Sequence, residues 1–157
     1  RFVQLAKRFL ENDSVLVVLT GSPRERKSIA ALIRQLPADR VANLAGKTTI
    51  RELIDLYNVG SLLITNDSGP GHFVSVTDLP AIVLYGPETP RIFGPIRPGI
   101  EAIHLGLACS PCISVYNQKK SACTDNQCLK QISVDRVYEK ALNLLASGDH
   151  LATARSR

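Results

Sequence analysis

The apolar segment at residues 61–65 runs directly into a polar, glycine-rich segment at residues 66–72, which is called the first turn below. A short run of apolar residues predicts a buried strand, and the Gly and Pro residues behind it predict a sharp turn into a helix. Parallel α/β proteins hold anionic ligands at such points, because free N–H groups at the helix start face the carboxyl end of the strand. The sequence therefore predicts a parallel α/β protein with a ligand-binding turn at 66–72.

A second turn of the same kind follows one strand further along the chain. Residues 81–85 form another apolar run, and the polar residues 86–90, called the second turn below, come directly after it. Because consecutive parallel strands end at the same edge of a sheet, we expect the two turns to form one site.

The rest of the chain repeats this alternation of strand and helix. Further strands are expected at 15–19, 41–44 and 101–105. Further helices are expected at 2–10, from the turn at 20–23 to about residue 36, at 50–56 and at 134–145. The run at 15–19 is continuously apolar, which predicts a central strand covered on both faces. This order predicts a Rossmann-like, doubly wound parallel sheet. We expect one domain over residues 1–147 and a flexible tail over 148–157.

Composition narrows the class of partner. The net charge of +5 comes from dispersed Lys and Arg, which suits phosphate-bearing small molecules or peripheral contact with an anionic membrane surface. With four Phe, four Tyr and no Trp, the chain offers no base-stacking platform, so no nucleic-acid partner is expected. No apolar run approaches the roughly 18 residues that span a bilayer, which predicts a cytoplasmic protein.

The beginning of the chain is unusual. It starts at Arg1, contains no Met, and shows helical periodicity from its first residues. We therefore expect it to be a piece of a longer protein.

The first turn offers several groups to a ligand. Gly69 allows close approach of the main chain to a diphosphate, Ser68 adds a hydroxyl donor, and Asp67 accepts from ligand hydroxyls or fixes the turn. His72, about one helical turn on, can donate to a phosphate or sugar oxygen. The alternative is that Asp67 or Ser68 merely caps the next helix and that His72 is an ordinary helix residue.

Two further turns between strand and helix carry glycine. One contains Gly21 and Glu25, and the other contains Gly46 and Lys47. The second is similar to the end of a phosphate-binding P-loop, but Val41 stands where that motif requires glycine, so the match fails. Lys47 is then equally well explained as a solvated loop lysine.

The four cysteines are clustered in the sequence. Cys109, Cys112, Cys123 and Cys128 have the spacing C-x2-C, ten residues, C-x4-C. Three hypotheses remain open: a structural zinc site, disulfides, or free thiols in a loop.

Taken in order, these motifs resemble a known family. The first turn, the segment 79–87 and Gly94-Pro95 resemble the signature of glycosyltransferase family 9, the ADP-heptose:lipopolysaccharide heptosyltransferases. Residues 44–49 fit the same family, and Cys109-Ser110-Pro111-Cys112 is similar to a subset that looks like heptosyltransferase II. The resemblance covers nearly the whole chain.

The resemblance implies the carboxyl-terminal, donor-binding half of a GT-B glycosyltransferase. The implied reaction is inverting and needs no metal, and it moves heptose or a related sugar from ADP-heptose to a lipopolysaccharide-core or other lipid-linked acceptor. The acceptor site and the general base would lie in the absent amino-terminal half, so no catalytic residue is expected here and this fragment alone should be inactive. The implied location is the cytoplasmic face of the inner membrane. The donor-binding residues implied are Asp67, Ser68, Gly69, Pro70, His72, Gly86, Pro87, Gly21, Glu25, Gly46 and Lys47, the last four toward the adenosine.

Two positions depart from the family pattern. Glu88 stands where the family often has Thr after Gly-Pro, and Gly71 precedes His72 where a larger residue is common. The sugar is therefore left open. The alternatives are a sugar-nucleotide epimerase of similar architecture and a non-catalytic interaction module built on zinc-bound cysteines.

Overall fold

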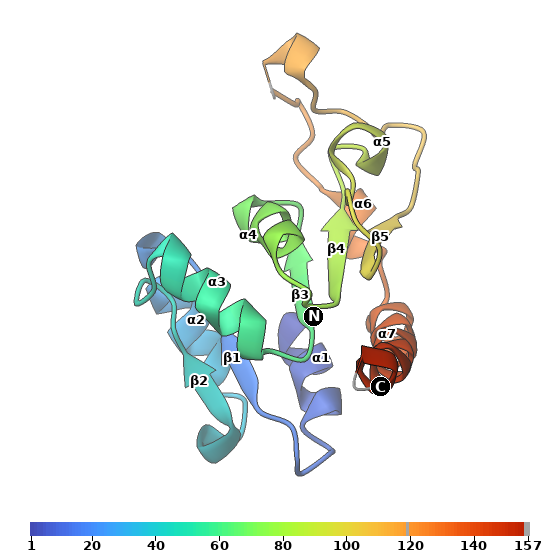
Figure 1. Ribbon diagram of the computed structural model, residues 1–157. Coiled ribbons are helices and arrows are strands. Elements are labelled where there is room, and N and C mark those ends of the chain that lie inside the picture. The colour runs from blue at the N-terminus through green and yellow to red at the C-terminus, as the bar shows by residue number, and fades with distance from the viewer. Residues whose placement is uncertain (119, 156–157) are drawn as a thin grey trace. The chain divides into compact units, whose positions relative to one another are not determined.

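The computed structural model describes residues 1–118 and 120–155 (Figure 1). The chain divides into two compact units, Arg1–Leu53 and Ile54–Arg157, and each is described by itself. Helix α3, Ile50–Val59, crosses the division.

The first unit contains a two-stranded parallel ladder. Strand β1 pairs with β2 so that Val17 lies opposite Val41 and Leu19 opposite Asn43. Its small core consists of Ala6, Leu10 and Leu36, with Val3, Val17 and Val41 packed against it. Its helices and strands are α1 (Phe2–Phe9), β1 (Val17–Leu19), α2 (Arg26–Ile33) and β2 (Val41–Asn43), with 3-10 helices at Pro23–Glu25 and Ala38–Arg40.

Strand β1 differs from its prediction. It was expected to be central and covered on both faces, but within the described residues it pairs with β2 alone, and Val18 is 39% exposed. A continuous apolar run does not by itself distinguish a fully covered strand from a half-covered one.

The second unit contains a three-stranded parallel sheet in the order β3-β4-β5 (Figure 1). The strands are β3 (Leu63–Asn66), β4 (Ala81–Tyr85) and β5 (Ile100–His104). The central strand β4 is the most buried of the three, with Ala81, Ile82, Val83 and Tyr85 all inaccessible to solvent or nearly so. Its continuous apolar sequence has the form expected of a strand packed on both faces.

Helices cover this sheet. Helices α6 (Gln127–Lys130) and α7 (Val134–Arg155) contact β4, and α4 (Gly69–Phe73) contacts β3. The unit also contains α5 (Pro90–Phe93) and 3-10 helices at Val74–Val76 and Val115–Asn117. Helix α7 starts as predicted, because the Ser133 hydroxyl accepts a hydrogen bond from the N–H of Arg136 at 3.2 Å.

The end of α7 differs from its prediction. The helix continues to Arg155 instead of ending at Leu145. No Pro interrupts this stretch, and a single Gly in a helix interior costs only about 1 kcal/mol. The flexibility of residues 148–157 stays a prediction, and residues 156 and 157 lie outside the described part of the chain.

The parallel α/β class is confirmed, and so is the position of every predicted strand to within two residues. The prediction of a single doubly wound sheet is not confirmed, because the described strands form two parallel ladders, β1-β2 and β3-β4-β5. Whether residues 1–147 fold as one domain stays a prediction. Across the described ranges, no helix combines the length and the apolar character needed to cross a bilayer.

The sheet of the second unit yields a stability prediction. Ile82→Ala should lower the free energy of unfolding by about 2–5 kcal/mol, because it opens a cavity in a core that tolerates little rearrangement. Ile96→Ala makes the same chemical change at a side chain that is 86% exposed, whereas Ile82 is 0% exposed. Urea denaturation measures the free energy of unfolding of both variants. Equal losses of this free energy in the two variants would contradict the position of β4 at the centre of the core.

Candidate functional site

The first and second turns meet at one pocket. Strand β3 pairs with β4 through Asn66 and Leu84, and the N–H of Asp67 extends this pairing by donating to the carbonyl of Leu84 at 3.0 Å. Both strands therefore end at the same edge of the sheet, as predicted. The pocket there has a volume of about 450 Å³. It is lined by Asn66, Asp67, Ser68, Gly69, His72, Leu84, Gly86, Pro87, Glu88, Ile113 and Leu129.

The first turn presents backbone donors to this pocket. Ser68 is the N-cap residue of α4, but its side chain makes no cap hydrogen bond and donates instead to the carbonyl of Asn66 at 3.1 Å. Capping by the Ser68 side chain, the alternative explanation of this residue, is therefore not what the structure shows. The first N–H groups of a helix have no partner within the helix. The backbone at Ser68 and Gly69 is thus suited to an anionic ligand.

His72 and Asp67 lie together in the pocket. The Nε2 atom of His72 is 4.0 Å from Oδ1 of Asp67, and the side chains are 56% and 19% exposed respectively. The pair becomes an ion pair whenever the imidazole is protonated. The first turn thus contributes one acidic and one basic side chain to the lining of the pocket.

The second turn brings a buried carboxylate. Glu88 lines the pocket and is only 7% exposed. Burial, followed by the negative charges of Asp67 and Glu88, raises the pKa of the neighbouring Tyr85 to about 12. The phenol therefore keeps its proton at neutral pH, and the carboxylates of both turns lie close to it.

The segment that bears the four cysteines, residues 109–128 and called the cysteine loop, packs against the second turn. The N–H groups of Cys112 and Ile113 both donate to the carbonyl of Pro87, at 2.9 and 3.1 Å. A β-carbon added to Gly86 would lie 2.6 Å from Cγ of Leu129 and 3.1 Å from Sγ of Cys128. Only glycine allows this close approach. Ile113 and Leu129 thereby form the apolar wall of the pocket.

A serine–histidine contact also fastens the cysteine loop. The Ser110 hydroxyl donates to the carbonyl of Gly86 at 2.6 Å, and Nε2 of His104 lies 3.0 Å from the same hydroxyl oxygen. Because a hydroxyl has one hydrogen to donate, His104 must be the donor in the second contact. His104, at the end of β5, is therefore protonated on Nε2.

The four cysteines do not assemble into a metal site. Cys109 and Cys123 are exposed, Cys112 is half-buried, Cys128 is buried, and all four are free thiols. In the described part of the chain, no three His, Cys, Asp or Glu side chains come together in a way that could hold a metal ion. Among the described residues the structure agrees with the free-thiol hypothesis, and the zinc site stays a prediction.

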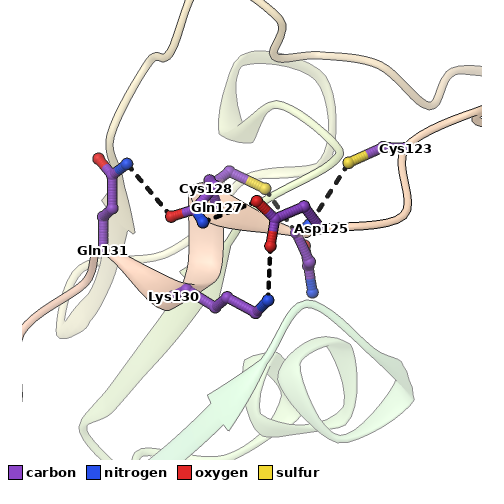
Figure 2. Close-up of polar contacts among 7 residues, drawn as sticks. Cys123, Asp125, Gln127, Cys128, Lys130 and Gln131 are labelled. Carbon is purple, nitrogen blue, oxygen red and sulfur yellow. Dashed lines mark hydrogen bonds and ion pairs between the residues drawn. The ribbon is translucent and has the colours of Figure 1, made fainter.

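Local hydrogen bonds explain the shape of the loop instead (Figure 2). Asn126 contacts two sulfur atoms: its N–H donates to Sγ of Cys123 at 3.4 Å, and its Oδ1 accepts from the Cys128 thiol at 3.3 Å. Asp125 accepts from Lys130 at 2.6 Å and from Gln127 at 2.7 Å. These contacts tie the loop to α6, which carries the pocket residue Leu129.

The remaining predicted residues lie in the first unit. Gly21 and Gly46 are joined by a hydrogen bond from the N–H of Gly46 to the carbonyl of Gly21 at 2.8 Å. Glu25 accepts from both the N–H and the hydroxyl of Ser22, and these bonds lower its pKa. Glu25 is thus explained as a helix-capping residue. The side chain of Lys47 is exposed to solvent. A role for these four residues toward adenosine stays a prediction.

Sequence reasoning found most of the pocket but not all of it. Of the predicted residues in the two turns, Pro70 alone is not among those that line it. Five lining residues were not predicted to bind a ligand: Asn66, Leu84, Glu88, Ile113 and Leu129. Leu84 could have been found, since it lies near the carboxyl end of a predicted strand; Ile113 and Leu129 carry no sequence signal that points to a pocket.

A parallel α/β unit with a polar pocket at the carboxyl ends of two adjacent strands has the arrangement found in nucleotide-binding α/β domains. Sequence comparison identifies the family. The profile described as glycosyltransferase family 9 (heptosyltransferase) matches residues 1–123. The chain belongs to glycosyltransferase family 9.

Several relatives are similar over most of this chain. Lipooligosaccharide heptosyltransferase 2 of Campylobacter jejuni is 30% identical over 92% of this chain and 44% of its own length. Lipopolysaccharide heptosyltransferase 2 of Salmonella typhimurium is 29% identical over 92% of this chain and 41% of its own length. The chain thus spans less than half the length of these relatives.

Two solved structures of family 9 glycosyltransferases are similar in fold to this chain. The structure of E. coli ADP-heptose LPS heptosyltransferase II has a TM-score of 0.76 and 25% identity, covering 94% of this chain and 41% of that one. A family 9 glycosyltransferase from Veillonella parvula has a TM-score of 0.77 and 25% identity, covering 93% of this chain and 40% of that one. The family resemblance expected from the motifs is therefore confirmed.

The close approach at Gly86 can be tested by substitution. Gly86→Ala should lower the free energy of unfolding by about 1–3 kcal/mol, because the added methyl group displaces Leu129 and Cys128. Gly60→Ala is the control, since a β-carbon there would lie 3.4 Å from Leu79, an ordinary contact. Denaturant titration compares the two, and an unaffected Gly86→Ala variant would contradict this packing.

The cysteines should differ in reactivity. Hydrogen bonds from the N–H groups of Asn126 and Asp125 lower the pKa of Cys123, whereas burial, followed by the charges of Cys112 and Cys109, raises the pKa of Cys128. A lowered pKa gives more thiolate at neutral pH, so iodoacetamide should modify Cys123 first and Cys128 last. As the pH is raised, the alkylation rate of Cys123 should level off first. The alkylation rate of Cys128 should keep rising further into the alkaline range.

Peptide mass spectrometry after timed alkylation of the native protein measures this order. Protein prepared under reducing conditions is analysed for metal in parallel. Near-stoichiometric zinc together with protection of all four thiols would contradict the free-thiol arrangement and restore the zinc site.

Proposed function

We propose that this chain is the donor-binding, carboxyl-terminal half of a GT-B glycosyltransferase. The reaction proposed is inverting, metal-independent transfer of heptose or a related sugar from ADP-heptose to a lipopolysaccharide-core or other lipid-linked acceptor. The observation that carries the proposal is that both polar turns line one pocket in a chain belonging to glycosyltransferase family 9.

The size and lining of the pocket support a nucleotide-sugar ligand. A volume of about 450 Å³ falls within the range of roughly 300–1,000 Å³ that is typical of small-molecule sites. Backbone donors at Ser68 and Gly69 suit the diphosphate, and the apolar surfaces of Ile113 and Leu129 suit a non-phosphate part of the donor.

The charges of the pocket assign a role to His72. Among the residues that line the pocket, His72 is the one basic side chain, while Asp67 and Glu88 are acidic. A diphosphate is then held best by the backbone amides together with the imidazole of His72, whose Nε2 lies 4.0 Å from Asp67. These donors would also stabilise the departing diphosphate in the transition state, the contribution that a metal makes in other enzymes.

The acceptor site and the general base are proposed to lie outside this chain. The chain covers 41–44% of the length of the Salmonella and Campylobacter relatives, and the resemblance assigns both functions to the other half of such enzymes. This fragment alone should therefore bind donor without transferring sugar. The place of action proposed is the cytoplasmic face of the inner membrane, with peripheral association.

The alternatives have less support. The relatives reported above are heptosyltransferases by name, which favours transfer over epimerisation. An interaction module built on bound zinc lacks its central feature, since no metal-holding group of side chains occurs among the residues described.

Donor binding to the intact enzyme tests the proposal. His72→Ala and Asp67→Ala should each weaken ADP-heptose binding about 10-fold or more, because hydrogen bonds to charged groups contribute about 1.5–3 kcal/mol. Asp55→Ala, at an exposed position of α3, is the control and should leave the affinity unchanged. Calorimetry measures all three, and unchanged affinity in correctly folded His72 and Asp67 variants would refute the assignment.

A further inference from the structure

The cysteine loop carries two neighbouring apolar side chains that the pocket does not use. Ile113 lines the pocket, whereas Val115 and Tyr116, two and three residues further on, are 57% and 92% exposed. Apolar residues exposed singly are ordinary in a folded protein, but neighbours exposed together on one turn indicate a contact surface. Residues 114–117, which include both side chains, are called the loop tip below.

Hydrogen bonds hold the loop tip in a defined conformation. The side chain of Asn117 accepts from the N–H of Ser114 at 2.8 Å and donates to the carbonyl of Cys112 at 3.0 Å. Gln118 then turns the chain back with a φ of 55°, in the left-handed region. The apolar side chains of the tip take no part in these bonds and are held in the solvent.

The loop tip is connected to the pocket through Cys112. The N–H of Cys112 donates to the carbonyl of Pro87 in the second turn, and its own carbonyl accepts from Asn117. Figure 1 shows the loop extending beyond the carboxyl ends of β4 and β5, with the short helix of the tip (orange) at its far end. A surface that contacts the tip therefore lies at the same edge of the sheet as the pocket.

The charge around the loop tip is positive. Among Asp, Glu, Lys and Arg, only Lys occurs at residues 102–124, and Lys120 is exposed. The N–H of Lys120 donates to the carbonyl of Asn117 at 3.0 Å, which keeps this residue beside the tip. The nearest acidic residue along the chain, Asp125, accepts a hydrogen bond from Lys130. Apolar side chains next to an exposed lysine are complementary to an anionic surface.

The size of the loop tip favours a lipid surface over a protein partner. A stable protein interface buries about 800 Å² on each partner, which two neighbouring side chains and a lysine do not provide. A bilayer interface needs less area, because aromatic rings settle at the headgroup level, and buried apolar area and nearby lysines both add to the binding energy. The side chains of the tip therefore fit an anionic bilayer.

We propose that the loop tip, together with Lys120, docks the enzyme on a bilayer that contains anionic lipid. The ring of Tyr116 lies at the headgroup level, Val115 adds apolar area, and Lys120 pairs with anionic headgroups. The proposal rests on the peripheral association proposed above and assigns a surface to it. Docking in this way brings the donor pocket next to the membrane that holds a lipid-linked acceptor.

Vesicle binding by the intact enzyme tests this inference. Co-sedimentation compares vesicles of phosphatidylcholine alone with vesicles that also contain phosphatidylglycerol. The wild type should bind the anionic vesicles more tightly, and added salt should weaken this binding. The variant that combines Val115→Ser with Tyr116→Ser should bind them about 10-fold or more weakly, because it loses the apolar area that leaves water on docking.

Two single variants complete the comparison. Val59 is 80% exposed at the end of α3, before β3 begins, and so lies at the opposite edge of the β3-β4-β5 sheet from the pocket. Val59→Ser should leave vesicle affinity within about 2-fold of wild type, the scatter typical of surface substitutions. Lys120→Gln should weaken binding to anionic vesicles and leave binding to phosphatidylcholine unchanged, because it removes a charge and no apolar area.

A fluorescent variant locates the contact. This chain contains no Trp, so Tyr116→Trp and Val59→Trp each add an emission that is measured as the difference from the wild type. On anionic vesicles that contain brominated lipid, the emission added by Tyr116→Trp should be quenched, and the emission added by Val59→Trp should not. This measurement decides the matter even if the serine variants fail to fold.

Three results would overturn the proposal: equal vesicle binding by the wild type and the folded double variant, no preference for anionic vesicles, or no quenching of the emission added by Tyr116→Trp. A double variant that binds vesicles normally but self-associates more weakly in ultracentrifugation would also overturn it, and would assign the tip to contact with a second copy of the enzyme.

Calorimetry with ADP-heptose separates this inference from the donor-binding function. Neither Val115 nor Tyr116 lines the pocket, so in the absence of vesicles the double variant should bind donor as tightly as the wild type. A wild type that binds vesicles through the tip but does not bind ADP-heptose would overturn the donor-binding function and support the docking surface.

Discussion

The parallel pairing of β3 with β4 is the constraint on which the site depends. The register from Leu63 opposite Ala81 to Asn66 opposite Leu84, extended by the hydrogen bond of Asp67 to Leu84, ends both strands at one edge. A shift of one residue would turn every side chain of β3 to the other face of the sheet. The side chains of β3 lie opposite the buried strand β4, so such a shift would also break the present hydrogen-bond pairing with the core strand. The polar turns are therefore held together by the packing of the core.

The cysteine loop completes the pocket from a distant part of the sequence. It is fastened to the second turn by the contacts of Cys112, Ile113 and Ser110 with the carbonyls of Pro87 and Gly86. Glycine at position 86 lets Leu129 and Cys128 approach closely enough to close the wall. The segment that bears the cysteines thus brings apolar surface to a polar site.

Much of this could be predicted from the sequence, and the failures have physical causes. The strands, the capping of α7 by Ser133 and the meeting of the two turns follow from local patterns. Strand β1 was misjudged because an apolar run does not report which of its faces are covered. The wall residues Ile113 and Leu129 were not predictable, since they act through packing between segments far apart in the chain. Glu88 was noticed only as a departure from a family pattern, with no indication that it would be buried.

The sequence by itself determined the parallel α/β class, the two ligand-facing turns and the membership of glycosyltransferase family 9, because strand periodicity, glycine positions and ordered motifs are local properties of the chain. Only the tertiary structure decided that the cysteine loop packs against the second turn, that an apolar wall faces the turns, and that the pocket holds a buried carboxylate. Burial, close approach and the sum of charges in a cavity depend on which segments meet. The packing of the whole core decides which segments come into contact, and no single position in the sequence encodes these contacts.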